Sequence, residues 1–306
     1  MHALVRKWLT YLERDRGASA HTIRAYASDL RHLQSYLDAR GVELSEADRR
    51  QLRGWLASLG SPGKRPAPAS LARRVATLRS FYGWAHAEGR LPANPAGLLR
   101  GPRVPKTVPR ILEVPEADAV MQRPSQHGIL ELRNRALLEL LYGAGLRVAE
   151  AVALDWPDVS IEERLVRVRS GKGGKARIVP FGPPAAAALD ALLRQLRAEA
   201  VDGSSSLFRN YRGGRLSSRS ARRIVSDAGA SAGVDRVHPH ALRHACATHM
   251  LSAGADLRAI QEQLGHAKLS TTERYTHVDP AHLLRVYRAA HPRARAVDKT
   301  GRETED

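Results

Sequence analysis

A short segment after the first third of the chain limits how this sequence can fold. Residues 101–109 read G-P-R-V-P-K-T-V-P, with three prolines and a glycine in nine residues. Proline lacks the amide hydrogen that a helix or an inner strand needs, so neither element is expected here. A chain of 306 residues is also longer than most single cores, which divide beyond ~250–300 residues. We therefore predict a linker at 101–109 between domains at 1–100 and 110–291, and a charged, disordered tail at 292–306.

Apolar residues recur at helical spacing through most of the chain. In the first domain two such runs end at Gly41 and Gly89, and Ser70 is the expected N-cap of the second. In the second domain, helical patterns cover residues 130–141, 147–154, 185–198, 239–251 and 257–264. Arginine alternates with valine over 164–169, which predicts a strand, and 177–179 predicts the returning strand. The expected fold class is mainly α, with a helical bundle followed by a helical domain that contains a small antiparallel β-sheet.

The charge of the chain favours a polyanionic partner, and nucleic acid above all. There are 49 Lys+Arg against 31 Asp+Glu, which gives a formal net charge of +18. Residues 51–107 contain ten lysines and arginines but one acid, Glu88. Arg73, Arg74 and Arg79 belong to this region and are candidate DNA contacts, although an ordinary solvated helix face could carry the same charges.

Cysteine usage and the N-terminus favour a cytoplasmic protein. The single cysteine, Cys246, excludes an internal disulfide framework and a zinc site built from several cysteines. One cysteine fits a reducing compartment, and the first residues lack the apolar core of a signal peptide. The longest apolar run, at 183–189, is far too short to cross a bilayer.

Residues 237–278 and two upstream cations form a set of side chains suited to phosphodiester chemistry. An arginine binds two phosphate oxygens with parallel donors, and a lysine on a flexible turn can donate a proton. A tyrosine can attack phosphorus and store the bond as a covalent phosphoester. Such a set could cleave a phosphodiester without a metal ion. The candidates are Arg147, Lys172, His240, Arg243, His266 and Tyr275.

Each candidate also has a simpler interpretation, and spacing alone does not choose between the two. Arg147 could be a surface charge, and Lys172 and Lys175 could be solvated turn residues or a phosphate nest without a catalytic role. His240 and His244 are four residues apart and could bind a metal, but H-A-L-R-H lacks the glutamate of H-E-x-x-H. His266 could cap a helix, and Tyr275 could be a core aromatic residue.

Five motifs in order resemble those of the tyrosine recombinase family of site-specific DNA recombinases. They are G-A-G-L-R-V-A-E (143–150), G-K-G-G-K-A-R (171–177), H-P-H-A-L-R-H (238–244), L-G-H (264–266) and S-T-T-E-R-Y-T-H-V (270–278). Near the N-terminus, R-G-A-S-A-H-T-I-R-A-Y resembles the family's helical core-binding domain. The resemblance covers almost the whole chain. It implies a helical-bundle core-binding domain that clamps DNA opposite a catalytic domain, and within the family it is strongest to the Xer type, in particular XerC.

The resemblance also implies a role for each candidate residue. Tyr275 would be the nucleophile and form a 3′-phosphotyrosyl bond, while Arg147 and Arg243 clamp the scissile phosphate. Lys172 would protonate the 5′ oxygen. The supporting residues would be His240 in proton transfer, His266 beside the phosphate and tyrosine, and Glu150 as an orienting group. Lys175 and Arg177, from the same glycine-rich motif as Lys172, are further candidate DNA contacts; no metal or other cofactor is implied.

The partners implied are double-stranded DNA, a XerD-like recombinase in a tetramer on two duplexes, and a septal DNA translocase. The implied process is strand exchange through a Holliday junction that resolves chromosome dimers, with residues 283–291 docking on a neighbouring protomer. A mobile-element or phage-type integrase, a topoisomerase IB-like nicking-closing enzyme and a catalytically silent DNA-binding protein remain alternatives. One departure is that Glu273 and Arg274 stand where the family often has glutamine and an aliphatic residue, which leaves the packing of the tyrosine helix open.

Overall fold

The computed structural model describes residues 2–60, 66–103, 110–122, 128–169, 176–198, 205–265 and 280–294. The chain forms two compact units, Met1–Val108 and Pro109–Asp306. Most of the predicted linker, at 104–109, lies outside the described residues. Among the residues described, no helix is long and apolar enough to cross a membrane.

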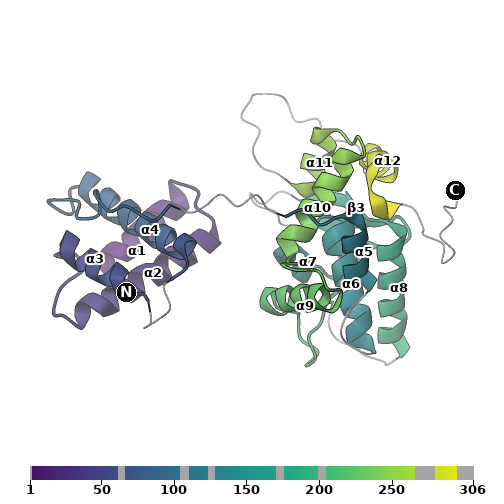
Figure 1. The fold of residues 1–306 in the computed structure, drawn as a ribbon, viewed down its shortest axis with the longest axis horizontal. Helices are drawn as coiled ribbons and strands as arrows, with labels where there is room; N and C mark the ends of the chain where they lie inside the picture. Colours follow the sequence, from purple (N-terminus) through teal and green to yellow (C-terminus); the bar gives the residue numbers. More distant parts are fainter. Residues whose placement is uncertain are drawn as a thin grey trace. The chain divides into compact units, whose positions relative to one another are not determined.

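The first unit is a bundle of helices around an aromatic core (Figure 1). Trp8 packs edge-on against Phe81 with ring centroids 5.5 Å apart, and the Tyr82 hydroxyl donates to the Leu44 carbonyl at 2.9 Å. The predicted apolar positions of the second helix, Leu30, Leu33 and Leu37, are fully buried. The helices are α1 (Ala3–Arg14), α2 (Ala20–Asp38), α3 (Arg49–Ala57) and α4 (Pro68–Ala87).

The start of α4 differs from the sequence prediction. The helix begins at Pro68 after Ala67, so Ser70 lies inside its first turn and is not the N-cap. Proline suits the first helical position because the amide hydrogen it lacks would have no partner there. The first residue of the helix, Pro68, therefore lies two positions before the predicted cap.

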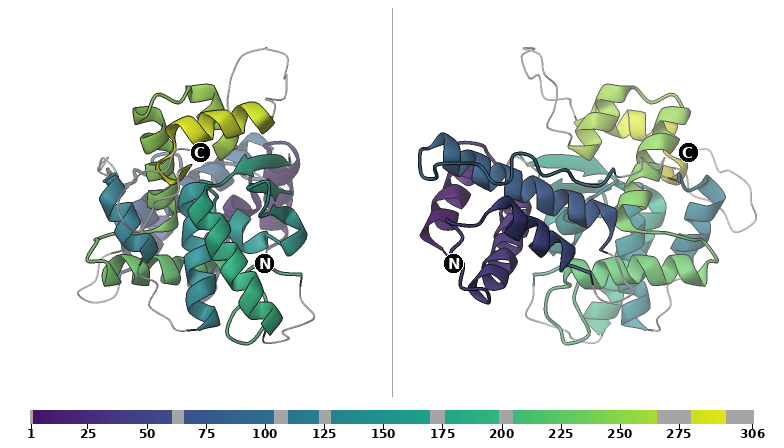
Figure 2. Two further views of the ribbon diagram at one scale, coloured as in Figure 1. Left: turned by 90° about the vertical axis from the view of Figure 1, so that its right-hand side faces the viewer. Right: turned by 60° about the vertical axis from the view of Figure 1, so that its left-hand side comes forward.

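The second unit is built around α6 (Ile129–Gly143), which is buried on nearly all sides. It packs against α5 (Val114–Gln122), α8 (Pro183–Ala198) and α10 (Pro239–Ser252), as Figure 1 shows for α5 and α8. In Figure 2, α9 (Ser218–Ser231) and the pair α11 (Leu257–Leu264) and α12 (Pro280–Ala290) lie toward opposite ends of α10. Contacts with α6, α11 and α12 hold α10 in place.

A three-stranded antiparallel sheet accompanies the helices and confirms the predicted strands. Its order is β1 (Val159–Ser160), β2 (Leu165–Val168), β3 (Arg177–Pro180). Val166 pairs with Val179, and both are fully buried. The register also places Val168 opposite Arg177, so Arg177 begins β3. Residues 170–175 lie outside the described residues.

The end of the chain packs further than the sequence predicts. The predicted tail starts at 292, but Pro292–Ala294 form a 3₁₀ turn in which Arg293 is buried and paired with Glu139 and Asp118. The packed chain therefore reaches at least Ala294. Leu283 and Tyr287 of α12 are also buried within their own unit. The predicted docking of residues 283–291 on a neighbouring protomer therefore concerns a segment whose apolar face is occupied in this chain.

Candidate active site

The turn between α6 and α7 (Val148–Ala153) positions the first candidate arginine. Gly145 has φ +61°, and a Cβ there would lie 2.8 Å from Leu264 Cδ2 and 3.1 Å from Cys246 Sγ. A side chain at this position would be strained and would also clash, so the turn requires glycine. Arg147 follows as the N-cap of α7, in an extended conformation that ends the turn.

Arg147 is held by one buried carboxylate and one main-chain carbonyl. Its backbone amide donates to Glu150 Oε2 at 2.8 Å, and its Nη1 donates to Glu150 Oε1 at 2.8 Å. Its Nη2 donates to the carbonyl of Gly265 at 3.1 Å. The side chain of Arg147 is 27% exposed, whereas that of Glu150 is 4% exposed. Arg147 therefore has a fixed orientation and an accessible edge.

Arg243, on α10, lies beside the same carboxylate. Its Nη1 lies 3.9 Å from Glu150 Oε2 and donates to the Gly145 carbonyl at 2.5 Å, and its Nη2 donates to the Leu264 carbonyl. Burial, together with the charge of Arg147, lowers the pKa of Arg243 to about 10. The guanidinium still carries its charge at neutral pH, so two fixed cations stand next to each other.

Glu150 stays ionised because arginines surround it. Burial by itself would raise the pKa of this carboxyl group. Hydrogen bonds and charge from Arg177, with hydrogen bonds from Arg147, outweigh burial and lower the pKa below its ordinary value. One carboxylate thus fixes several guanidinium groups without neutralising them all.

His240 lies in the first turn of α10, on the exposed side. Burial, followed by the charges of His238, Arg243, Arg222 and Arg147, lowers its pKa. A neutral imidazole at pH 7 can accept a proton, as the predicted role requires. His238 is the N-cap of α10 and its Nδ1 accepts from the Ala241 amide at 3.0 Å.

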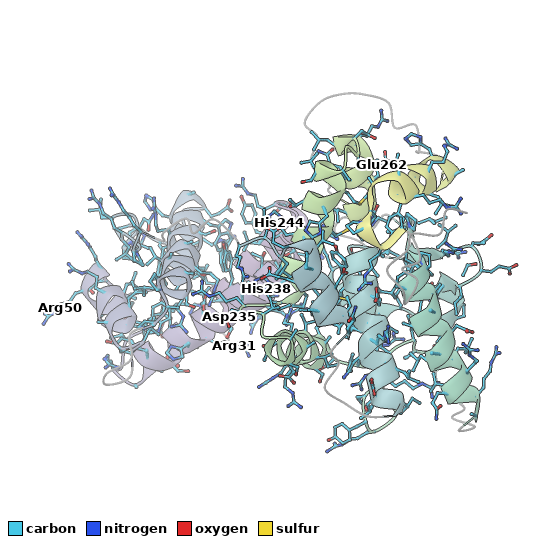
Figure 3. The ribbon with its side chains drawn as sticks, turned by 45° about the vertical axis from the view of Figure 1, so that its right-hand side comes forward. Arg31, Arg50, Asp235, His238, His244 and Glu262 are labelled. Carbon is cyan, nitrogen blue, oxygen red and sulfur yellow. The ribbon has the colours of Figure 1, made fainter. Side chains whose placement is uncertain are left out.

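His240 and His244, the pair that could bind a metal, have no third ligand beside them among the described residues. His244 is exposed on α10, and Figure 3 shows His238 and His244 along the start of this helix. Among the described residues, no group of three or more His, Cys, Asp or Glu side chains could hold a metal ion.

Three of the six predicted catalytic residues are thus brought together: Arg147, His240 and Arg243. Lys172, His266 and Tyr275 lie outside the described residues, as do Lys175, Glu273 and Arg274. The described stretch 205–265 ends at Gly265, whose carbonyl binds Arg147, so the residue directly before His266 lies at the arginine pair.

Comparison with known proteins identifies the fold and the chemistry. Residues 109–282 match the phage integrase family, and residues 5–89 match its N-terminal SAM-like domain. This chain belongs to the phage integrase family. It is a site-specific tyrosine recombinase, a DNA-binding enzyme that breaks and rejoins strands, and the predicted resemblance to this family is confirmed.

Full-length relatives of the recombinase are named tyrosine recombinase XerC. The protein of Myxococcus xanthus is 44% identical over 299 residues, covering 95% of this chain and 98% of the relative. That of Xanthomonas campestris pv. campestris is 41% identical over 298 residues, covering 97% and 90%. These relatives confirm the predicted resemblance to the XerC type.

Solved structures confirm the predicted fold class. XerH recombinase in a post-cleavage complex with palindromic difH substrate has a TM-score of 0.64 at 21% identity, covering 93% of this chain and 80% of that chain. A lambda integrase dimer bound to a COC′ core site has a TM-score of 0.62 at 20% identity, covering 91% and 99%.

The structure gives Arg177 a different environment from the one predicted. The sequence indicates a DNA contact, but Arg177 Nη1 and Nη2 donate to the two oxygens of Glu150 at 3.0 and 2.9 Å. Its Nε donates to the Gln263 carbonyl at 3.1 Å, and the side chain is 13% exposed. Each nitrogen of this guanidinium therefore has a protein acceptor, which the charge of the motif could not reveal.

Arg73 and Arg74 of the recombinase also have a structural partner. Both pair with Asp29, which is 3% exposed, and the Thr77 hydroxyl donates to the same carboxylate at 3.0 Å. Arg79, on the same helix, is exposed and has no ion pair among the residues described. Figure 3 labels two further exposed arginines of this unit, Arg31 and Arg50. Any DNA contact by Arg73 is thus combined with a role in the bundle.

Proposed function

We propose that Arg147 and Arg243 clamp the scissile phosphate while Tyr275 attacks it. The observation that carries this proposal is the Glu150 cluster, in which one carboxylate is surrounded by Arg147, Arg177 and Arg243. Three guanidinium groups and one carboxylate leave an excess of two positive charges. That excess matches the charge that develops on a pentavalent phosphorane, and donors fixed in advance stabilise such charge most effectively.

In the proposed reaction, the Tyr275 oxygen forms a bond to phosphorus and the bond from phosphorus to the 5′ oxygen breaks. The phenol proton passes to His240, and Lys172 protonates the departing 5′ oxygen. A phenol with a pKa near 10 is roughly 0.1% ionised at pH 7, a cost of ~4 kcal/mol that the nearby cations and base must offset. The 3′-phosphotyrosyl bond keeps the energy of the broken phosphodiester, so a 5′-hydroxyl from another strand can attack it and rejoin the DNA. His266 supports the phosphate and the phenol.

We further propose that the recombinase resolves chromosome dimers in the cytoplasm, as half of a tetramer with a XerD-like partner on two duplexes. The support is the similarity to proteins named XerC over nearly the whole chain. A septal DNA translocase would be the further partner. Docking of residues 283–291 on the adjacent protomer would couple the two subunits.

The test uses a DNA site selected from a randomised duplex library by the recombinase together with the second recombinase of the same genome. A supercoiled plasmid carrying two copies of this site is incubated with the recombinase, alone and with the second recombinase of the same genome. Two circles are expected only when the second recombinase is present. Two circles from the recombinase alone would favour an integrase that acts as a homotetramer. Relaxation without exchange in both reactions would contradict recombination and favour a nicking-closing enzyme.

A further inference from the structure

Three successive carbonyls at the end of α11 each accept a hydrogen bond from a different arginine. Arg177 binds the Gln263 carbonyl, Arg243 binds that of Leu264, and Arg147 binds that of Gly265. The last carbonyls of a helix have no partner within the helix, and they form the negative end of its dipole. Cations are therefore well placed there, and the helix end connects all three arginines.

Glu150 is a second partner that the same three arginines share. Arg177 occupies both of its oxygens in a bidentate pair, and Arg147 donates to both as well. A bidentate pair fixes the plane of a carboxylate, which a single hydrogen bond does not. Arg177 and Arg147 therefore fix the orientation of Glu150 together, and Arg177 is the one whose side chain binds both carboxylate oxygens.

The absence of a side chain at Gly265 leaves room for the Arg177 guanidinium. Gly265 has φ +63° and caps α11, and a Cβ at this position would lie 3.0 Å from Cζ of Arg177. The guanidinium therefore packs directly against the backbone that leads to His266. Arg177 is the one member of the trio that comes from the sheet, because it begins β3.

We propose that Arg177 is a positioning residue for DNA cleavage, which orients Glu150 and the end of α11 and thereby places Arg147 and Arg243. This inference rests on the proposed function, in which those two arginines clamp the scissile phosphate. Arg177 itself contacts no reacting atom. Its role is distinct from the DNA contact that the basic motif suggests.

The first test compares Arg177→Lys with Arg177→Gln in the full chain. Binding to the selected duplex should stay within about twofold, while the single-turnover rate of covalent capture falls roughly 100-fold for both variants, as expected for a misplacement of about 1 Å. Lysine keeps the charge but cannot reproduce the fork that binds Glu150 and Gln263. If Arg177→Lys cleaves at the wild-type rate, charge alone suffices and the proposal is wrong.

The second test changes the DNA at the scissile phosphate. A methylphosphonate there removes the negative charge that the clamp binds, so the defect of Arg177→Gln should shrink by about tenfold or more relative to ordinary DNA. The ratio of the two rates in one protein preparation is independent of the fraction that is folded. An equal defect on both substrates would overturn the proposal, because the fault would then lie outside the clamp.

A third substrate separates the clamp from the leaving group. A 5′-bridging sulfur leaves as a thiolate without needing a proton, so the defect of Arg177→Gln should persist on it. A defect abolished by this sulfur would assign Arg177 to protonation by Lys172 and overturn the proposal.

The control is Arg194→Gln, which removes an arginine that is 72% exposed on α8 and paired with Asp190. Its rates should match those of the wild type. If the wild-type chain itself forms no adduct through Tyr275, the proposed function fails, whereas equal rates in wild type and Arg177 variants reject this inference alone.

Discussion

Arg147 Nη2 donates a hydrogen bond to the Gly265 carbonyl at 3.1 Å, although 118 positions separate the two residues in the chain. The bond connects the first clamp arginine to the residue before His266. Since Arg243 binds the preceding carbonyl, at Leu264, the arginine pair and the start of the segment that carries His266 and Tyr275 share one anchor. This shared anchor supports the proposal that residues from distant motifs meet at one phosphate.

The turn before Arg147 should tolerate only glycine. Gly145→Ala adds a strained left-handed residue and a Cβ that contacts Leu264 and Cys246, so the free energy of unfolding should fall by about 2–4 kcal/mol. Gly233→Ala is the matched control, because Gly233 has φ +71° but nothing within 4 Å of its added Cβ. That variant should lose only about 1–2 kcal/mol. Urea denaturation measures both, and equal losses would show that the close contact at Gly145 has no energetic effect.

Two candidate DNA contacts on α4 should behave differently. Arg73→Gln removes a partner of the buried Asp29 and should destabilise the first unit by about 1–3 kcal/mol. Arg79→Gln should leave the stability unchanged, because Arg79 is exposed. If both side chains contact phosphates, each substitution should reduce the slope of log K against log salt by about 1. Melting curves and salt titrations separate the two effects; an Arg73→Gln protein as stable as the wild type would contradict the structural role.

The pH dependence of cleavage should reflect His240. The folded protein lowers the pKa of this imidazole below its ordinary value of 6.5, so the neutral, proton-accepting form persists as the pH falls through 6.5. The single-turnover cleavage rate should therefore stay constant from pH 7.5 through that value and decline only at lower pH. His240→Asn should cleave more slowly and lose this decline. A rate that already falls by half between pH 7.5 and 6.5 in the wild type, but not in His240→Asn, would show that the pKa is not lowered.

The sequence predicts the strands, the main helices and the positions of the arginines, because each has a local signature. Valine alternates with arginine in β2, and Val166 and Val168 are indeed buried while Arg167 is exposed. The acceptors that organise the site have no such signature, since the carbonyls of Gln263, Leu264 and Gly265 belong to the backbone. Only the tertiary packing of β3, α10 and the turn before α7 against the end of α11 brings three arginines to them.

Arg177 shows the same limit of sequence interpretation. The sequence alone does not show whether an arginine in a glycine-rich basic motif contacts a phosphate or a buried carboxylate. The choice depends on Glu150, which lies 27 positions away in the chain and reaches Arg177 through the tertiary fold.

Covalent capture tests the central claim most directly. The recombinase is incubated with a nicked duplex that carries the selected site, so that cleavage releases a short strand and the protein–DNA adduct accumulates. The wild type and the control Tyr211→Phe, which alters a tyrosine 74% exposed in the same unit, should both form the adduct. Tyr275→Phe should form none, and peptide mapping of the wild-type adduct should place the DNA on Tyr275. An adduct from Tyr275→Phe would contradict the account.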